Sequence, residues 1–203
     1  MTHGATKGTG VEPQPVGDEA YRAFMSSFPT GVSVVTTVDT DGRPRGMTCS
    51  SLSGVSLDPP VLSVCLSVTS RTLPLVRTHG FFGVNLLGAC GTAVARLFAD
   101  SSRRHFEQVP WQPAAGTGLP RLEGDTVAFA ECRVMDAKCV GDHVVVFGEV
   151  VGVDCAAGAP LLYGRRQFVG WPGTDHGGGT DSVGSGARQQ VREVPASTLP
   201  SAG

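Results

Sequence analysis

An apolar stripe with helical spacing lies near the start of the chain, formed by Tyr21, Phe24, Met25 and Phe28. Steps of three and four residues place these side chains on one face of a helix, which Asp18 can cap and which Pro29 and Gly31 end. From 32 to 38 the period becomes two, as in a half-buried strand. The pattern therefore predicts a helix followed directly by a strand.

The rest of the chain continues this strand-like alternation, interrupted by turn residues. Further strands are expected at 44–55, 61–68, 81–87, 127–139 and 143–153. Two short strands, at 161–163 and 167–169, are expected to close the sheet. Turns are expected at Asp41-Gly42, Asp58-Pro59-Pro60 and Gly141-Asp142, and 111–120 reads as a Gly/Pro loop. Short helices are expected from Ser70 or Thr72 to Thr78 and around 94–98. This order predicts a mainly β fold, a closed or nearly closed antiparallel barrel with a few short helices.

Both ends of the chain differ in composition from its middle. Residues 1–17 are rich in Gly, Pro and Thr and are expected to be a disordered leader, and residues 172–203 are expected to be a disordered tail. Neither segment carries enough apolar surface to offset the entropy of ordering. The folded domain is expected at 18–171, a usual size for one domain.

Charge and cysteine usage narrow the class of protein. A net charge of −2 and a pI near 6.2 argue against a nucleic-acid partner, and no apolar run is long enough to cross a membrane. The six cysteines show no CxxC spacing, which favours reduced thiols and a cytoplasmic location. Charged residues make up only 17%, which suggests that a partner or second subunit covers part of the surface.

Several common catalytic motifs are missing from the sequence: the GxGxxG loop, the phosphate-binding GxxxxGK[ST] loop, the GxSxG elbow and metal-ligand spacings. One strand instead carries a run of small side chains, Thr48, Cys49, Ser50 and Ser51. Small residues let an aromatic ligand approach the backbone, and hydroxyl groups can bond its polar atoms. The alternative is a Ser/Thr-rich edge strand that faces water.

The chain resembles the flavin reductase family, the short NAD(P)H:flavin oxidoreductase components of two-component flavin-dependent monooxygenases. The resemblance runs from about Tyr21 to Trp171. It is carried by the segments 28–37, 41–48, 50–51 and 55–62 together with Ser70-Arg71-Thr72, 82–87, Arg104-His105-Phe106, Gly141-Asp142-His143 and Gly148-Glu149-Val150. The family usually has Ala and Phe where this chain has Cys49 and Leu52. The fold that the resemblance implies is an FMN-binding split barrel.

The resemblance also implies a set of cofactor-binding residues. The residues that would line the flavin are Thr48, Cys49, Ser50, Ser51, Cys65 and Leu66. Its phosphate would be bound by Ser70 and Thr72. The ring would contact Asn85 and Leu86, and its outer side would be closed by Arg104 and Phe106. Each also has an ordinary structural interpretation, as a cap, a satisfied strand polar group or a core residue. His143 is the catalytic candidate: it would orient the nicotinamide or protonate the reduced flavin, or it is only a turn histidine bonded to Asp142.

The function that the resemblance implies is reduction of FMN or FAD by NADH or NADPH, with release of the reduced flavin to a flavin-dependent monooxygenase. Relatives bind flavin at a dimer interface, which implies a homodimer. Two alternatives stay open from the sequence. One is a split-barrel oxidase that holds FMN tightly, and the other is a flavin-binding carrier without catalysis.

Overall fold

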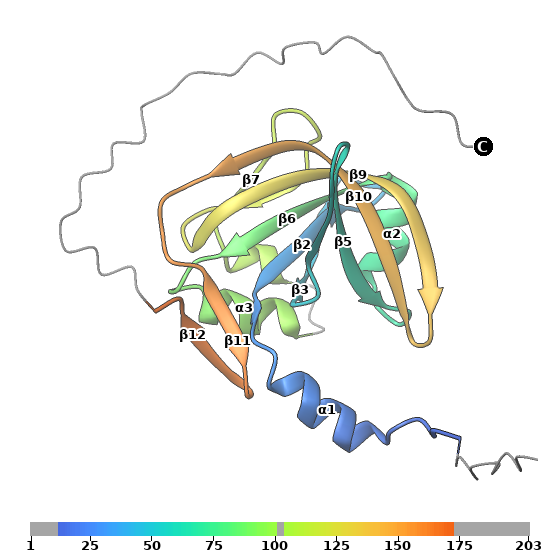
Figure 1. Ribbon diagram of the computed structural model, residues 1–203. Helices are drawn as coiled ribbons and strands as arrows, with labels where there is room; N and C mark the ends of the chain where they lie inside the picture. Colours follow the sequence, from blue (N-terminus) through green and yellow to red (C-terminus); the bar gives the residue numbers. More distant parts are fainter. Residues whose placement is uncertain (1–11, 101–103, 173–203) are drawn as a thin grey trace, which may run out of the picture.

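The computed structural model describes residues 12–100 and 104–172, and a seven-stranded antiparallel sheet dominates it (Figure 1). The strand order is β3-β2-β6-β9-β10-β5-β4. The strands span β2 Ser33–Val38, β3 Pro44–Cys49, β4 Ser53–Leu57, β5 Pro60–Ser67, β6 Phe81–Leu87, β9 Thr126–Val140 and β10 His143–Cys155. The mainly β, antiparallel fold expected from the sequence is confirmed.

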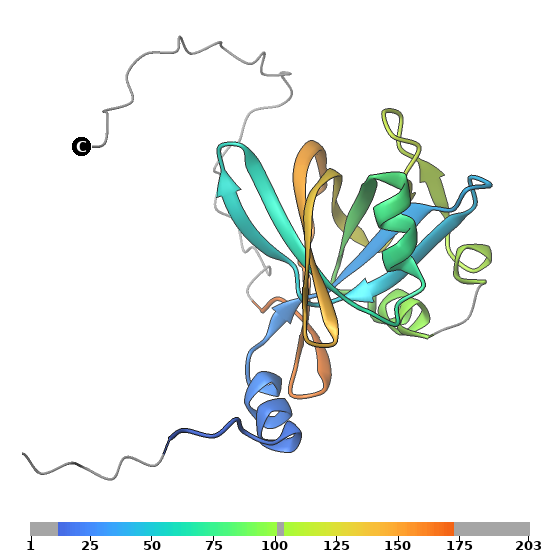
Figure 2. The same cartoon turned by 90° about the vertical axis from the view of Figure 1, so that its right-hand side faces the viewer.

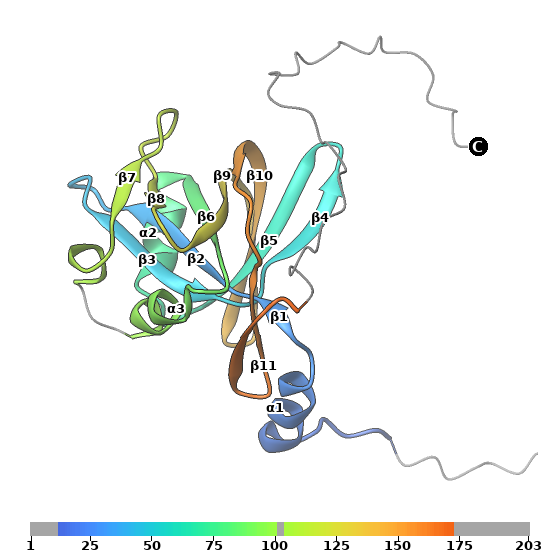
Figure 3. The ribbon, with the colours of Figure 1, turned by 90° about the vertical axis from the view of Figure 1, so that its left-hand side faces the viewer.

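The sheet curls strongly but does not close, which gives a split barrel (Figures 2 and 3). Register shifts in the β9–β10 pair, at Phe147/Gly148 and Val150/Gly152, mark irregularities of the kind that bend a sheet. The strand expected over 44–55 is in fact two strands. The chain leaves the sheet at residues 50–52, so β3 and β4 end up at opposite edges.

Two smaller sheets complete the β structure. β1 (Thr30–Gly31), β11 (Leu161–Gly164) and β12 (Gln167–Gly170) form a separate three-stranded sheet, so the last two strands do not complete the main sheet as expected. The expected loop at 111–120 contains pairing strands at its ends, β7 (Trp111–Pro113) and β8 (Pro120–Leu122).

Short helices cover two sides of the sheet and bury two apolar clusters. α2 (Thr72–His79) contributes Leu73 and Val76 to a cluster inside the barrel, and α3 (Thr92–Ala99) contributes Ala95 and Phe98 to a second cluster. A single turn of 3-10 helix, η1 (His105–Glu107), follows α3 in the chain. These helices hold the connections that surround the site described below.

The first helix, α1 (Asp18–Ser26), projects from the base of the barrel (Figures 1 and 2). Its N-cap is Gly17 rather than Asp18, which is the first helical residue. No α1 residue is buried, and Phe24 and Phe28 are 72% and 63% exposed. The apolar stripe is therefore present but uncovered in the isolated chain. Phe28, just beyond the helix, continues it.

The expected leader and tail lie mostly outside the described residues. Of the leader, only 12–17 are described, and they have no regular structure. Of the tail, only Pro172 is described. Within the described part of the chain, no helix has both the length and the apolar character needed to cross a membrane.

Candidate flavin and nucleotide pocket

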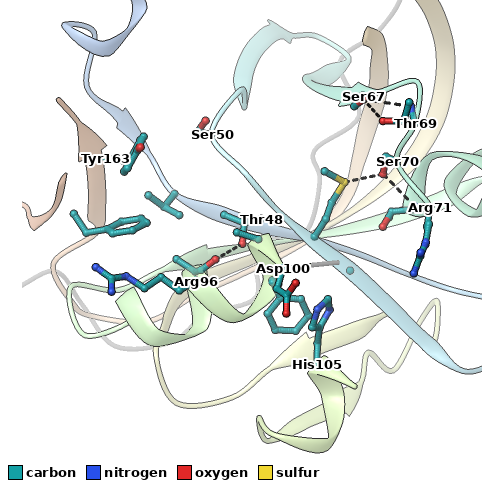
Figure 4. Close-up of a pocket in the computed structure, with 18 of the residues that line it drawn as sticks. Thr48, Ser50, Ser67, Thr69, Ser70, Arg71, Arg96, Asp100, His105 and Tyr163 are labelled. Carbon is teal, nitrogen blue, oxygen red and sulfur yellow. Dashed lines mark hydrogen bonds between the residues drawn. The ribbon is translucent and has the colours of Figure 1, made fainter. Parts of the chain in front are cut away.

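A cavity with a volume of about 780 Å³ lies between β3, α3, the β5–α2 connection and the β11–β12 hairpin (Figure 4). Its size is typical of small-molecule sites. Four of the residues expected from the sequence line it together: Thr48, Ser50, Ser70 and Thr72. These come from two segments, 48–50 and 70–72, which the barrel brings to one place.

One end of the cavity is rich in hydroxyl groups. The β5–α2 connection supplies Ser67, Thr69, Ser70, Arg71 and Thr72. The Ser70 hydroxyl accepts a hydrogen bond from the Thr72 amide (3.2 Å) and donates one to Met47 Sδ (3.0 Å). Hydroxyls, an arginine and the start of a helix form a donor set that suits a phosphate group. We refer to residues 67 and 69–72 as the hydroxyl end.

The middle of the cavity is bounded by β3 and α3. Thr48 ties the two elements together, since its hydroxyl donates to the Ala95 carbonyl at 2.6 Å. Gly46 keeps this wall close to α3: a Cβ there would lie 3.0 Å from the Val35 carbonyl oxygen and 3.2 Å from Phe98 Cε1. The absence of a side chain at Gly46 therefore preserves the packing of β3 on Phe98.

His105 contributes an unpaired polar atom to this wall. His105 is 7% exposed, its ring lies 4.9 Å from the Phe98 ring, and its Nε2 has no hydrogen-bond partner among the residues that the structure describes. Buried polar atoms are nearly always paired, so this nitrogen is one that a polar ligand group would satisfy.

Taken together, the hydroxyl end, the β3 wall and His105 fit a phosphorylated aromatic ligand such as a flavin. The hydroxyl end would hold the phosphate, and Thr48 and Ser50 would flank the ring and its chain.

The opposite end is aromatic and cationic. Tyr163 on β11 and Phe168 on β12 lie with their ring centroids 4.9 Å apart, and Arg96 of α3 lies 5.9 Å from the Phe168 centroid. Arg166, in the β11–β12 turn, also lines the cavity. We refer to Arg96, Tyr163, Arg166 and Phe168 as the aromatic end. None of these four was singled out from the sequence as a site residue, because three of them belong to a short hairpin and Arg96 to a short helix, and neither element carries a motif.

Several of the expected flavin contacts are not placed on this cavity. The Cys49 side chain is buried beside the Ser51 hydroxyl, and burial raises the pKa of its thiol. The Ser51 hydroxyl instead bonds the backbone of Cys65, accepting from its amide (2.9 Å) and donating to its carbonyl (3.1 Å). Leu66 is fully buried in the barrel core. None of these three side chains lines the cavity, although Ser51 lines a smaller hollow that also includes Ser50, Tyr163 and Arg166.

Asn85 and Leu86 do not line this cavity either. Asn85 is fully buried, and its amide group donates to Val34 and Pro120 carbonyls and the Thr36 hydroxyl, while its oxygen accepts from the Leu122 amide. Its hydrogen-bonding capacity is used inside the fold, so it is a satisfied strand polar group. Leu86 packs against the barrel core.

Arg104 and Phe106 do not line the large cavity either. Phe106 packs edge-on against Phe98 and Trp111 and lines a smaller neighbouring hollow. Arg104 is exposed, and its backbone carbonyl accepts a hydrogen bond from Gln108.

His143 lies at the start of β10, at the rim of the hydroxyl end. Its Nδ1 lies 2.8 Å from Asp142 Oδ1, and this hydrogen bond lowers the pKa of the Asp142 carboxyl. His143 is exposed and does not line the cavity of its own chain. Within residues 12–100 and 104–172, no group of three His, Cys, Asp or Glu side chains has a metal-binding arrangement.

Comparisons with known proteins agree with this geometry. Residues 25–172 match the model of the flavin reductase like domain. The chain is 50% identical over 151 residues to a flavin reductase (NADPH) of Lentzea aerocolonigenes, covering 74% of this chain and 88% of the relative. It is 33% identical over 153 residues to a flavin-dependent monooxygenase reductase subunit of Mycobacterium tuberculosis, covering 74% and 80%.

A solved structure shows the same architecture. The NADH:FAD oxidoreductase of Streptomyces globisporus, in complex with NAD and FAD fragments, superposes with a TM-score of 0.73 at 32% sequence identity. The match covers 80% of this chain and 100% of the other.

Proposed function

Because the chain belongs to the family of flavin reductase-like domains, we propose that it catalyses the NAD(P)H-dependent reduction of FMN or FAD and passes the reduced flavin to a partner monooxygenase. The observation that carries the proposal is the cavity with its hydroxyl end beside α2. A relative named as a monooxygenase reductase subunit supports the partner, and relatives named for NADPH and NADH support the hydride donor.

In this proposal the bound flavin supplies the hydride-accepting chemistry, and the protein binds and orients the reactants. Ser70 and Thr72 hold the phosphate at the start of α2, with Arg71 beside them. Thr48 on β3 and Ser50 just beyond it set the position of the ring. The walls formed by Phe98 and Met47 exclude water from one side of the site.

The exposed stripe of α1 supports a homodimer. Tyr21, Phe24, Met25 and Phe28 are all at least 40% exposed on one face, an arrangement that a second copy would cover. Since His143 does not line the cavity of its own chain, we propose that it acts at the rim, toward the nicotinamide or the reduced flavin.

We place the protein in the cytoplasm, where NAD(P)H is available and the six free thiols stay reduced.

The proposal is tested by following the oxidation of NADH and NADPH by the purified full-length chain with and without added FMN or FAD. A flavin reductase turns over steadily only when free flavin is supplied. An oxidase that holds FMN tightly would carry flavin through purification and require another electron donor. A carrier would bind flavin without oxidising either nucleotide. The second and third results would each refute the proposal.

A further inference from the structure

The turn between β11 and β12 is built from two arginines in an unusual backbone conformation. Arg165 and Arg166 form a two-residue loop between the paired residues Gly164 and Gln167, with φ angles of 48° and 61°. Turns that need positive φ at both positions normally use Asn and Gly, because other side chains are strained there. Two arginines in such a turn suggest that a side chain is needed at this place.

Only one of these arginines faces the site. Arg166 lines both the large cavity and the smaller hollow of about 550 Å³ that adjoins it beside α1. Arg165 lines neither of the two, and its amide donates to the Ser26 carbonyl at 2.7 Å, which anchors the turn to the end of α1. The turn therefore directs one of its two cations to the cavity.

A second cation reaches the same end of the cavity from another element. Arg96 of α3 lies over the ring of Phe168, and Phe168 is paired with Tyr163 between β11 and β12. Among the described residues, no carboxylate lies within 4.0 Å of the charged groups of Arg96 or Arg166. By contrast, Arg45 on the neighbouring β3 is paired with Asp39 at 2.8 Å. The aromatic end thus carries positive charge that no carboxylate of residues 12–100 and 104–172 neutralises by direct pairing.

The two ends of the cavity lie on opposite sides of Thr48 (Figure 4). In the proposed function, the hydroxyl end takes the phosphate of the flavin, so the flavin phosphate does not account for the cations at the other end. The second reactant is a pyridine nucleotide, whose nicotinamide must stack on the flavin ring while its phosphates extend beyond the ring. The aromatic end could bind this part of the nucleotide, because its two arginines suit phosphate groups and its pair of rings suits adenine or ribose.

We propose that Arg166 and Arg96, with the Tyr163–Phe168 ring pair, form the phosphate-binding part of the site for the hydride-donating nucleotide, an assignment that rests on the proposed function. The shared chemistry is a phosphate of the nucleotide. It is either the diphosphate that NADH and NADPH have in common or the 2′-phosphate that only NADPH carries.

The test compares Arg166→Ala and Arg96→Ala with the matched control Arg165→Ala, which removes the same charge from the same turn. One readout is calorimetric binding of ADP-ribose and 2′-phospho-ADP-ribose, which contain the phosphates but no nicotinamide. The other is the KM for NADH and NADPH at saturating FMN. Loss of a charge-assisted contact to phosphate should weaken binding and raise KM by about tenfold in the Arg166 and Arg96 variants. The control should match the wild type.

Arg166→Gly separates binding from folding, because glycine relieves the positive-φ strain while removing the same side chain. It should bind the nucleotides as weakly as Arg166→Ala but melt at an equal or higher temperature. Arg166→Lys keeps the charge and should retain part of the affinity.

The two possible phosphates give different results, and each supports the proposal. A loss confined to 2′-phospho-ADP-ribose and NADPH identifies the 2′-phosphate, and an equal loss for both pairs identifies the diphosphate. Unchanged nucleotide affinity in both variants, an equal loss in Arg165→Ala, or a loss of FMN affinity instead would overturn it. If the wild type oxidises neither nucleotide, the proposed function fails, whereas calorimetry still decides whether Arg166 binds these phosphates.

Discussion

Ser67 on β5 and His143 on β10 are directly paired across the sheet, so their side chains leave the same face. Ser67 lines the hydroxyl end of the cavity, whereas His143 stands beside it at the tip of the β9–β10 hairpin. Residues in directly opposed positions have Cβ atoms about 5 Å apart. The histidine expected from the sequence to act in catalysis therefore reaches the rim of the site, close enough for a ligand or a second chain to bring it into contact.

His143→Ala should slow flavin reduction in stopped-flow experiments at saturating NADH. We expect an effect near the low end of about 10²–10⁴-fold, because hydride transfer itself needs no proton from the protein. FMN affinity should not change, since the side chain lies outside the cavity. His79→Ala, a partly exposed histidine at the end of α2, is the control. A wild-type rate in a folded His143→Ala variant would show that His143 is only a turn residue.

Ser70→Ala tests the hydroxyl end. Removing a hydroxyl that bonds the flavin phosphate should weaken FMN binding by about tenfold, the loss expected for one hydrogen bond to a charged group. Riboflavin lacks the phosphate, so its affinity should stay the same. Fluorescence titrations of both flavins provide the measurement, and the exposed Ser53→Ala is the control. Equal weakening of FMN and riboflavin would place the phosphate elsewhere.

Ser51→Ala should affect stability rather than binding. The Ser51 hydroxyl bonds both backbone groups of Cys65, just beyond the last pair of the β4–β5 ladder, Ser53 and Ser63. Leaving these partly buried groups unpaired should lower the free energy of unfolding by about 1–3 kcal/mol. Urea denaturation measures this loss, and an FMN titration should show unchanged affinity. If affinity falls while stability is retained, Ser51 contacts the flavin directly.

Cys132 should make stability depend on pH in the alkaline range. Burial raises the pKa of this thiol from 9.0 to about 12. A raised folded-state pKa gives stability that is complete below pH 9 and is lost as the pH rises toward 12, because the unfolded chain then releases the proton first. The thiol should contribute a slope of at most about 1.4 kcal/mol per pH unit. Melting curves from pH 8 to 11 should fall more gently in Cys132→Ala, and parallel curves for the two proteins would refute this assignment.

Phe24→Glu tests the role of the α1 stripe. The side chain is 72% exposed in the isolated chain, so the charge should not destabilise a monomer, but it would be buried in a dimer that covers the stripe. Sedimentation equilibrium should give twice the chain mass of 21.0 kDa for the wild type and 21.0 kDa for the variant. Glu19→Lys, on the opposite face of the helix, should remain dimeric. A monomeric wild type would rule out this role for α1.

Much of the secondary structure was predictable because it depends on local patterns. The alternation at 81–87 and the Gly141-Asp142 turn correspond to β6 and to the hairpin between β9 and β10. The small-residue run at the end of β3 and just beyond it also pointed to a site, and two of its members, Thr48 and Ser50, line the cavity. Local patterns fail where strands end, as at residues 50–52, because whether a strand continues depends on its neighbour in the sheet.

The sequence by itself determined the antiparallel β character, the turns and the segments that carry the family resemblance, since each depends on neighbouring residues. Only the tertiary structure decided which polar groups line the cavity. Asn85 and Ser51 look like binding residues in the sequence, but contacts with Pro120 and Cys65 use their hydrogen bonds within the fold. Arg166 attracts no attention in the sequence, yet the β11–β12 turn brings it to the cavity that Ser67 lines from the other end. The periodic pattern of a strand shows which face of the strand a residue occupies. A cavity forms only where that face meets segments that are distant in the sequence, and the pattern does not show which segments these are.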